Sequence, residues 1–353
     1  MVKLILKILG GTLGGILVLL IGLIAFLSVT EFKPAARETV ADYKIAENAP
    51  TLQAGQTVTV YTWNMGYAGL GKDSDFFMDG GKMVDPPSQT AVENNMAAIR
   101  EYIGSQEADA WLLQEVDVRS ARTENMNQFA LLQESWEGSS GFAYNYKCPF
   151  VPIPLPPMGR IEGGIATLTA GATSQDMERV SLPCPFSWPV RVAQIKRCLM
   201  ITRMPIEGTD RELVLVNLHL EAYDDGEGKK AQTELLLQVL QEEYEKGNYV
   251  IAGGDFNQSF PGVLDQYPVA DPSKWTPGIL EDGTLPEGWH FAYDTSAPTC
   301  RLLDQPYNEN CQLYVIDGFI LSPNVQLQSV QTQDLDFQNS DHNPVRLQVT
   351  LVP

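Results

Sequence analysis

From residue 57 onward the chain alternates apolar, strand-like segments with helix-like ones, and no other feature restricts its fold so strongly. VTVYTWN at 58–64 and YVIAGGD at 249–255 have the apolar character of buried strands. KKAQTELLLQVLQEEYEK at 229–246 instead places apolar side chains on one face at helical spacing. Isolated helices between many strands must cover the faces of sheets. The pattern therefore predicts one α/β domain of about 300 residues with two sheets.

An uncharged apolar run precedes this domain and extends from Ile8 to Thr30. As a helix it would be roughly 33 Å long, which matches the core of a bilayer. A cleaved signal peptide is the main alternative, but its apolar core is only about 7–15 residues long. The end of the run, FLSVTEF, also offers no small-x-small cleavage site. We therefore expect a transmembrane anchor over 1–30, a polar linker over 31–55 and the α/β domain over 56–353.

The charges that flank the run give a weak indication of its orientation. Lys3 and Lys7 favour a cytoplasmic N-terminus, but Lys33 and Arg37 follow closely, so the two sides are nearly balanced. We expect a short cytoplasmic tip, a single span of the cell membrane and a large domain outside the cytoplasm. Gly10, Gly11, Gly14 and Gly15 form two GxxxG spacings, which could also pack helices into a weak homodimer.

Overall charge and cysteine usage limit the classes of function. With 24 basic and 44 acidic residues the formal net charge is −20, whereas nucleic-acid binding depends on Lys and Arg that neutralise phosphates. The charge argues against a general nucleic-acid binder, although a local basic groove would be compatible with it. The five cysteines show no CxxC pair and no zinc spacing. Cys300 and Cys311 could form a disulfide or remain unpaired buried thiols.

Polar residues recur at the ends of the apolar strands, where burial is costly unless a carboxylate is paired or bound to a metal. Taken singly, each has a plain structural explanation, because a lone histidine is usually a satisfied core residue and SDH is usually a turn. Their joint occurrence instead favours one convergent site. The residues are Asn64, Glu115, His219, Asp255, Asn257, Asp317, Asp341 and His342.

Six segments that contain these residues occur in a characteristic order between residues 60 and 345. They are TWNMG, LLQEVD, NLHL, GGDFN, VIDGFILS and SDHNPV. In this set and order the sequence resembles the endonuclease/exonuclease/phosphatase (DNase I-like) superfamily. The resemblance implies a four-layer α/β sandwich, in which two packed mixed sheets are flanked by helices and the site lies at one edge of the sheets. It also implies a metal-dependent hydrolase of phosphoester bonds.

The resemblance further implies how a divalent metal would be held. Glu115 would be the main ligand of Mg²⁺ or Mn²⁺, which are hard ions that prefer carboxylate oxygens. Asn64 would lie beside the ion, and Asp341 would support it directly or through water. One departure is Gly66, which stands where some nuclease members have a carboxylate. This weakens the similarity to DNA-repair enzymes.

The remaining residues would carry the chemistry that the resemblance implies. Asp255 would orient or deprotonate the attacking water, and Asn257 would hold water or a phosphate oxygen. His342 would contact the scissile phosphate while Asp317 pairs with its ring. His219 would stabilise phosphate charge or assist the leaving group.

Several weaker features have both a structural and a functional interpretation. Arg119, Arg122 and Arg160 could bind a substrate phosphate or could simply be solvated. The proline-rich segment 148–160 cannot be a central strand and is expected as a surface loop at the rim of a site. This loop and Trp188 could touch lipid, although most exposed loops of this kind do not.

The sequence leads to one main functional hypothesis and two alternatives. The main hypothesis is hydrolysis of a phosphoester at the outer membrane face, with a lipid headgroup or small molecule favoured over nucleic acid. One alternative is an extracellular nuclease of the same fold. The other is a catalytically silent, membrane-tethered binding module.

Overall fold

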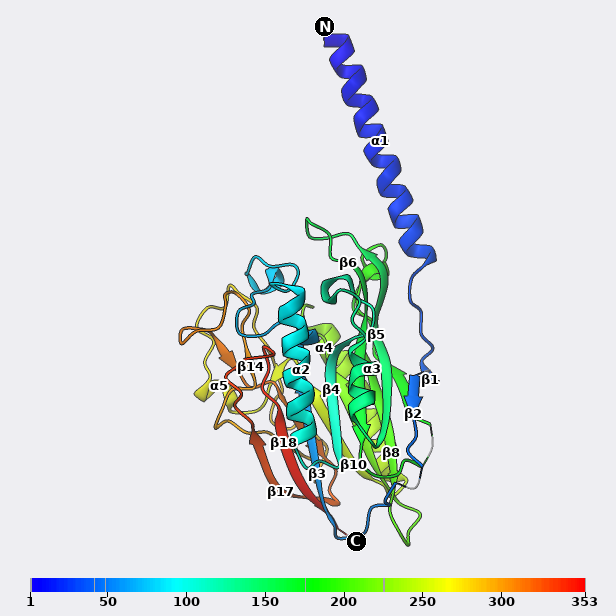
Figure 1. Cartoon of the computed structure of the whole chain (residues 1–353), viewed down its shortest axis with the longest axis vertical. Coiled ribbons are helices and arrows are strands. Elements are labelled where there is room, and N and C mark those ends of the chain that lie inside the picture. The colour runs from blue at the N-terminus through cyan, green and yellow to red at the C-terminus, as the bar shows by residue number, and fades with distance from the viewer. Residues whose placement is uncertain (1, 41, 48, 175, 225, 353) are drawn as a thin grey trace.

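Two seven-stranded mixed sheets form the centre of the domain, and helices cover their outer faces (Figure 1). The computed structural model describes residues 2–40, 42–47, 49–174, 176–224 and 226–352. The first sheet has the order β1 (Arg37–Thr39), β7 (Glu178–Ser181), β8 (Cys198–Pro205), β9 (Glu212–His219), β10 (Tyr249–Asp255), β16 (Asp317–Leu321) and β13 (His290–Ala292). The second has the order β17 (Val325–Thr332), β18 (Val345–Leu351), β3 (Thr57–Asn64), β4 (Ala110–Asp117), β6 (Gly159–Thr169), β5 (Ser139–Val151) and β2 (Asp42–Lys44).

Apolar side chains from both sheets meet between them and form the central core. Leu112 and Leu347 of the second sheet pack in the same cluster as Leu215, Ile251 and Phe319 of the first, and all five are fully buried. The longer outer helices are α2 (Gln89–Ser105), α3 (Gln128–Ser135) and α4 (Glu227–Glu245). α2 and α3 pack on the second sheet and α4 on the first. This arrangement confirms the predicted four-layer α/β sandwich.

The α2 sequence explains both ends of that helix and its buried face. The Ser88 side chain accepts a hydrogen bond from the Ala91 amide and caps the N-terminus. Val92, Met96, Ile99 and Ile103 are buried at helical spacing against the second sheet. The helix ends at Ser105, one residue beyond Gly104.

Short elements connect the sheets. The single-turn helices are η1 (Gly66–Ala68), η2 (Phe77–Asp79), η3 (Ala121–Thr123) and η4 (Val190–Ala193), and α5 (Val263–Gln266) is also short. Two small ribbons pair β11 (Gln258–Ser259) with β12 (Gly278–Ile279) and β14 (Cys300–Arg301) with β15 (Leu313–Tyr314). The proline-rich loop is shorter than expected, because 147–151 continue β5 and the connection to β6 begins at Pro152.

The N-terminal helix α1 (Val2–Val29) projects away from the domain (Figure 1). It is long and apolar enough to cross a membrane, with a mean hydropathy of 2.6 in its best window, a criterion that a signal sequence would also meet. Most of its side chains are exposed, and Leu27 near its C-terminal end is buried against the domain. The glycines between 10 and 15 have open space beside them, and dimerisation through this face stays a prediction.

The segment expected to be a polar linker adds an edge strand to each sheet. β1 pairs with β7, and β2 pairs with β5. Arg37 of β1 forms ion pairs with Glu178 and Glu242, which attach the segment to the first sheet and to α4. Residues 31–55 therefore follow the surface of the domain over much of their length.

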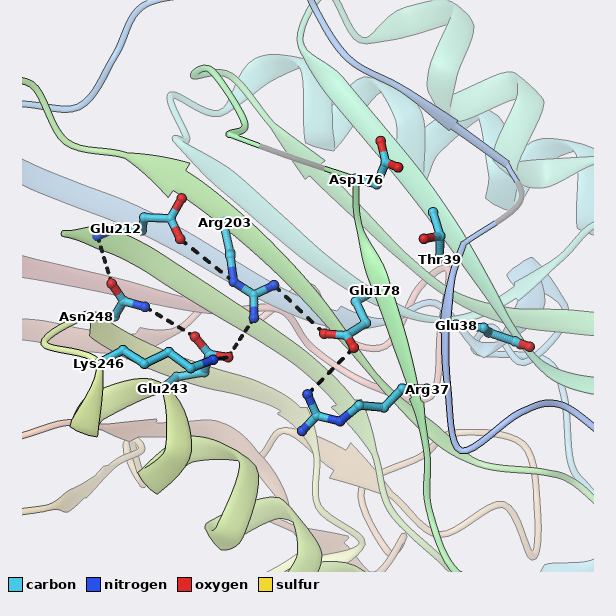
Figure 2. A pocket seen from close by; sticks show the side chains of 10 residues that line it. All are labelled: Arg37, Glu38, Thr39, Asp176, Glu178, Arg203, Glu212, Glu243, Lys246 and Asn248. Carbon is cyan, nitrogen blue, oxygen red and sulfur yellow. Dashed lines mark hydrogen bonds and ion pairs between the residues drawn. The ribbon is translucent and has the colours of Figure 1, made fainter. Parts of the chain in front are cut away.

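A groove of about 740 Å³ lies beside β1, and charged side chains line it (Figure 2). The buried Arg203 lies between Glu178, Glu212 and Glu243, and Lys246 also pairs with Glu243. Because these charges satisfy one another, the groove is a structural ion-pair network that joins β1, the first sheet and α4.

Candidate active site

Three adjacent strands of the first sheet place three predicted site residues side by side. In the register of the sheet, Asp255 on β10 is opposite His219 on the parallel strand β9 and opposite Asp317 on the antiparallel strand β16. All three side chains are buried. The strand pairing alone therefore brings together residues that are up to 98 positions apart in sequence (317 − 219).

The second sheet contributes Asn64 and Glu115 from the ends of the parallel strands β3 and β4. The pairing of β4 with β6 is irregular between Leu113 and Val116, and Glu115 within this bulge has a φ of +53°. A positive φ is unfavourable for a residue with a side chain and is characteristic of functional sites. The bulge re-aims the Glu115 side chain, so that its Oε1 lies 3.3 Å from Asn64 Nδ2.

His342 is held by Asp317, the residue that the sequence predicts to pair with its ring. Its Nδ1 lies 2.8 Å from Asp317 Oδ2, and its backbone carbonyl accepts a hydrogen bond from the Trp63 indole. The backbone amide of His342 also donates to Ser340 Oγ. The ring is therefore fixed in orientation, with Nε2 directed towards the centre of the site.

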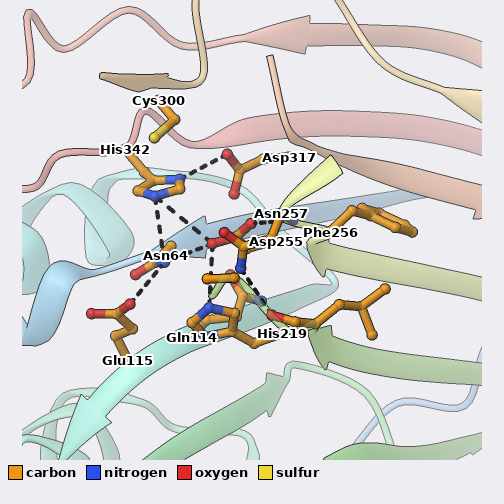
Figure 3. Close-up of polar contacts among 12 residues, drawn as sticks. Asn64, Gln114, Glu115, His219, Asp255, Phe256, Asn257, Cys300, Asp317 and His342 are labelled. Atoms are coloured by element: carbon orange, nitrogen blue, oxygen red, sulfur yellow. Dashed lines mark hydrogen bonds and ion pairs between the residues drawn. The ribbon is translucent and has the colours of Figure 1, made fainter. Parts of the chain in front are cut away.

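The Asp255 carboxylate is the point on which the other polar groups converge (Figure 3). Its Oδ2 accepts a hydrogen bond of 3.0 Å from Asn64 and lies 3.4 Å from His219 Nε2 and 3.8 Å from His342 Nε2. Its Oδ1 accepts a hydrogen bond of 2.8 Å from the Asn257 backbone amide. Donors thus surround the carboxylate on several sides, which orients it and stabilises its charge.

Burial and neighbouring charges give the two histidines opposite protonation states. Burial and the charges of Arg197 and His342 lower the pKa of His219 well below its ordinary value. Burial would also lower the pKa of His342, but the adjacent Asp317 carboxylate and other acidic groups raise it well above that value. The surroundings therefore favour the neutral form of His219 and the protonated form of His342.

The site also contains carboxyl groups whose charge is poorly compensated. Burial, with a contribution from Asp317, raises the pKa of Asp255 to about 6. Burial and the Glu115 carboxylate raise the pKa of Asp341 to about 7. Burial also raises the pKa of Glu115, against the opposing effect of Arg122. Several buried acidic groups that lack enough positive partners are suited to a bound cation.

The donor atoms fit a hard divalent ion on the Glu115 side of the site. Glu115 and Asp341 offer carboxylate oxygens, which are the preferred ligands of Mg²⁺ and Mn²⁺. Asn64 lies beside Glu115, but it faces Glu115 and Asp255 with its Nδ2, and its Oδ1 accepts a hydrogen bond from the Gly66 amide. A tighter group of potential ligand atoms is formed by Asp255, Asp317 and His342, which lie within 4.8 Å of one another. In this second group the Nδ1 of His342 is already paired with Asp317, and the predicted role of Glu115 and Asp341 as metal ligands stays a prediction.

Gly66 and Asp341 are neighbours in space, which explains why glycine stands at position 66, where some nuclease members have a carboxylate. A Cβ at residue 66 would lie 2.6 Å from Asp341 Oδ1, and the φ of Gly66 is +50°. A carboxylate side chain at position 66 would therefore compete with Asp341 for the same space. Here Asp341 occupies the region that a side chain at 66 would fill.

Asn257 is buried, and it hydrogen-bonds both to the neighbouring backbone and to Asp255 in the site. Its side-chain Nδ2 donates to the Leu220 carbonyl, and its φ is +50°. These contacts fix the chain just after β10, so that the Asn257 amide can donate to Asp255. The arrangement does not test the predicted contact of Asn257 with water or phosphate, which stays a prediction.

Residues from several loops enclose the site in a cavity of about 290 Å³. Arg122 lies inside it, donates two hydrogen bonds of 3.0 Å to Asp117 and stacks on the Tyr67 ring at 3.5 Å. Arg119 and Arg160 are instead half-exposed and pair with Glu162. Of the three arginines noted in the sequence, Arg122 is thus the one placed in the site.

Sequence reasoning missed two polar pairs in the cavity wall. Arg197 pairs with Glu221, and the Tyr223 hydroxyl donates a hydrogen bond of 2.8 Å to Asp79. The segments around them carry no recurrent motif, although Glu221 follows His219 by only two residues at the end of β9. Cys300 lines the same cavity as a buried free thiol, and Cys311 is also a free thiol, so the structure shows the unpaired alternative.

The fold is thus a two-sheet α/β sandwich with carboxylates, amides and histidines gathered at one edge. The chain belongs to the endonuclease/exonuclease/phosphatase family, whose model matches residues 61–342. Members of this family are generally phosphoester hydrolases that typically require a divalent metal. No protein of curated function matches the sequence.

Solved structures share the fold at low sequence identity. An endonuclease/exonuclease/phosphatase from Beutenbergia cavernae is 16% identical with a TM-score of 0.59, covering 84% of this chain and 72% of that one. A second, from Bacteroides vulgatus, is 18% identical with a TM-score of 0.54, covering 84% and 99%. Truncated TDP2 from Caenorhabditis elegans is 18% identical with a TM-score of 0.51, covering 84% and 99%.

Proposed function

We propose that this chain hydrolyses a phosphoester bond at the outer face of a membrane, in a lipid headgroup or a small molecule rather than in nucleic acid. The observation that carries the proposal is the position of the Asp255 carboxylate between a neutral histidine and a protonated one. A base and an acid whose pKa values are shifted in a buried cavity are characteristic of acid–base catalysis.

Glu115 and Asp341 would hold the divalent ion, Mg²⁺ or Mn²⁺, with Asn64 beside it. When bound, the ion supplies positive charge that stabilises the charge developing on the phosphate oxygens. The protein's own residues supply the remaining functions.

Asp255 accepts the proton of the attacking water. Its Oδ2 is oriented by Asn64 and its Oδ1 by the Asn257 amide, so the carboxylate does not need to reorganise during the reaction. A pKa of about 6 keeps it ionised at neutral pH and still basic enough to take the proton.

His342 provides a positive hydrogen-bond donor at Nε2. Asp317 holds the opposite nitrogen, which fixes the ring and preserves its charge. The donor contacts a phosphate oxygen and stabilises the negative charge of the transition state. Neutral His219, on the other side of Asp255, donates a hydrogen bond to the leaving group.

The cavity wall and the overall charge support the substrate class. Aromatic side chains line the cavity beside the polar centre, including those of Tyr67, Phe76, Tyr146, Phe186 and Trp275. Such walls suit a compact headgroup or small organic phosphoester. A net charge of −20 disfavours a polyanion by comparison.

The proposal is tested with the purified full chain in detergent micelles, with and without Mg²⁺ and Mn²⁺. The substrates are bis-p-nitrophenyl phosphate, sphingomyelin, inositol phosphates and supercoiled plasmid. We expect metal-dependent turnover that His342→Ala abolishes. His290→Ala is the matched control, because His290 lies on β13 outside the cavity.

Each other outcome has a defined meaning. Cleavage of plasmid alone, falling steeply with salt, would favour the nuclease. If the folded protein turns over none of the substrates and its melting temperature does not change on adding Mg²⁺ or Mn²⁺, the binding module would be favoured.

A further inference from the structure

Four large apolar side chains are exposed on two neighbouring connections. Ile153 and Leu155 in the β5–β6 loop are 68% and 88% exposed, and Trp188 and Val190 in the β7–β8 connection are 59% and 55% exposed. We refer to Ile153, Leu155, Trp188 and Val190 as the apolar rim. A cluster of apolar side chains of this size in water is unusual unless it contacts a partner.

The β5–β6 loop lies at the end of the domain from which α1 departs, whereas the C-terminus lies at the opposite end (Figure 1). The last turns of α1 contact β5 and η4. Leu27 packs in one buried cluster with Val151 and Met158. The Trp188 indole donates a hydrogen bond of 3.0 Å to Ser28 Oγ at the end of α1. A helix that crosses a bilayer would thus bring the rim to the level of the membrane surface.

The exit of α1 is fixed by charges as well as by apolar packing. The Glu31 side chain is nearly buried and forms ion pairs with Arg191, Lys196 and Lys33. Arg191 and Lys196 belong to the same β7–β8 connection as Trp188 and Val190. The helix end and the rim are therefore held together as one surface.

The chemistry of the β5–β6 loop suits insertion into a lipid interface. Pro152, Pro154, Pro156 and Pro157 alternate with Ile153 and Leu155. Proline has no backbone N–H, so moving this loop out of water leaves few amide donors unsatisfied. Tryptophan next to basic side chains is typical of the headgroup region, and the exposed Lys147 and Arg160 flank the loop.

The rim and the catalytic cavity share the same two connections. Tyr146 and Met158, on either side of the β5–β6 loop, line the cavity, and so do Phe186 and Ile195 of the β7–β8 connection. We propose that the apolar rim docks into the bilayer that α1 crosses and holds the mouth of the cavity against the lipid headgroups. This rests on the proposed function in one respect, because it makes the bilayer the source of the phosphoester.

The test measures depth in the membrane and requires no activity. Leu155→Cys is introduced into the full chain in a Cys184→Ser background, because the other four native cysteines are buried. The protein is labelled with an environment-sensitive fluorophore and reconstituted into phosphatidylcholine nanodiscs with or without a lipid that carries a spin label near its headgroup. Val352→Cys, an exposed apolar position at the far end of the domain, is the matched control.

We expect the label at 155 to shift to shorter wavelength and to lose at least half of its intensity to the spin label, with no loss at 352. Equal quenching at both positions, or none at 155, would overturn the docking. A second measurement separates docking from catalysis. We expect Ile153→Ser/Leu155→Ser to reduce turnover of vesicle-embedded substrate at least tenfold and to leave turnover of bis-p-nitrophenyl phosphate unchanged. Equal loss on both substrates would contradict the inference.

Discussion

His342 Nδ1 lies 2.8 Å from Asp317 Oδ2, and the opposite nitrogen of the same ring lies 3.8 Å from Asp255 Oδ2. The ring therefore bridges a carboxylate that orients it and a carboxylate that faces the reaction centre. Among the described residues, the second oxygen of Asp317 has no hydrogen-bond partner. Asp317 thus directs its interaction to His342, which predicts that its role is exerted through that ring.

Asp317→Asn should reduce kcat about 100-fold with a much smaller change in KM, because the amide can no longer stabilise the charged ring. The Asp317 carboxylate raises the pKa of His342, so its removal lowers that pKa. The loss of activity on the alkaline side should then begin at a lower pH than in the wild type. Steady-state kinetics from pH 5 to pH 10 check this, and an unshifted alkaline limb would contradict it.

Asp255→Asn should reduce kcat by about 10³-fold, because the asparagine cannot accept the proton of the attacking water. In the wild type the pKa of Asp255 is raised to about 6, so the carboxylate becomes protonated as the pH falls through that value. Wild-type activity should therefore decline below about pH 6, and the residual activity of the variant should lack this decline. A variant that keeps the wild-type acidic limb would assign the base to another group.

Gly66→Ala should weaken Mn²⁺ binding about tenfold without unfolding the domain. The added Cβ would lie 2.6 Å from Asp341 Oδ1 and displace that carboxylate, and a positive φ disfavours alanine at this position. Isothermal titration calorimetry of the full chain measures the affinity. Gly104→Ala is the matched control, because its Cβ would meet no atom within 4 Å near the end of α2. Equal affinity in the two variants would remove Asp341 from the metal site.

The eight site residues could be located from sequence because each lies in or next to an apolar strand, where a polar side chain is conspicuous. The order of the motifs then indicated the family and its two-sheet sandwich, which the strand order confirms. The bulge that turns Glu115 towards Asn64 could not be predicted, because it depends on the pairing of β4 with β6 across about 50 residues (164 − 116 = 48).

Other features stayed hidden because local sequence carries too little information about long-range packing. Thr39 and Tyr43 lie in a polar segment that reads as a linker, yet their strands complete the two sheets. Arg122 appeared equally suited to solvent, whereas its Asp117 and Tyr67 contacts bury it. The exposed side chain of Leu155 acquires a possible role only because its loop follows β5, the strand that the end of α1 contacts.

Glu243→Gln should destabilise the domain by about 2 kcal/mol at pH 7. Burial would raise the pKa of Glu243, but Lys246 and Arg203 more than offset this, so the pKa is lowered. A carboxyl group with a lowered pKa stabilises the folded state above its unfolded pKa of about 4.3, and this stabilisation is lost as the pH falls through the folded value. The difference between variant and wild type should therefore shrink below about pH 4. Urea unfolding of the full chain in micelles, followed by tryptophan fluorescence at pH 7 and pH 3, measures it. Glu234→Gln, at an exposed position of α4, should change stability by less than about 0.5 kcal/mol at both pH values. A deficit of Glu243→Gln that is equal at pH 7 and pH 3 would show that the Glu243 charge does not stabilise the ion-pair network.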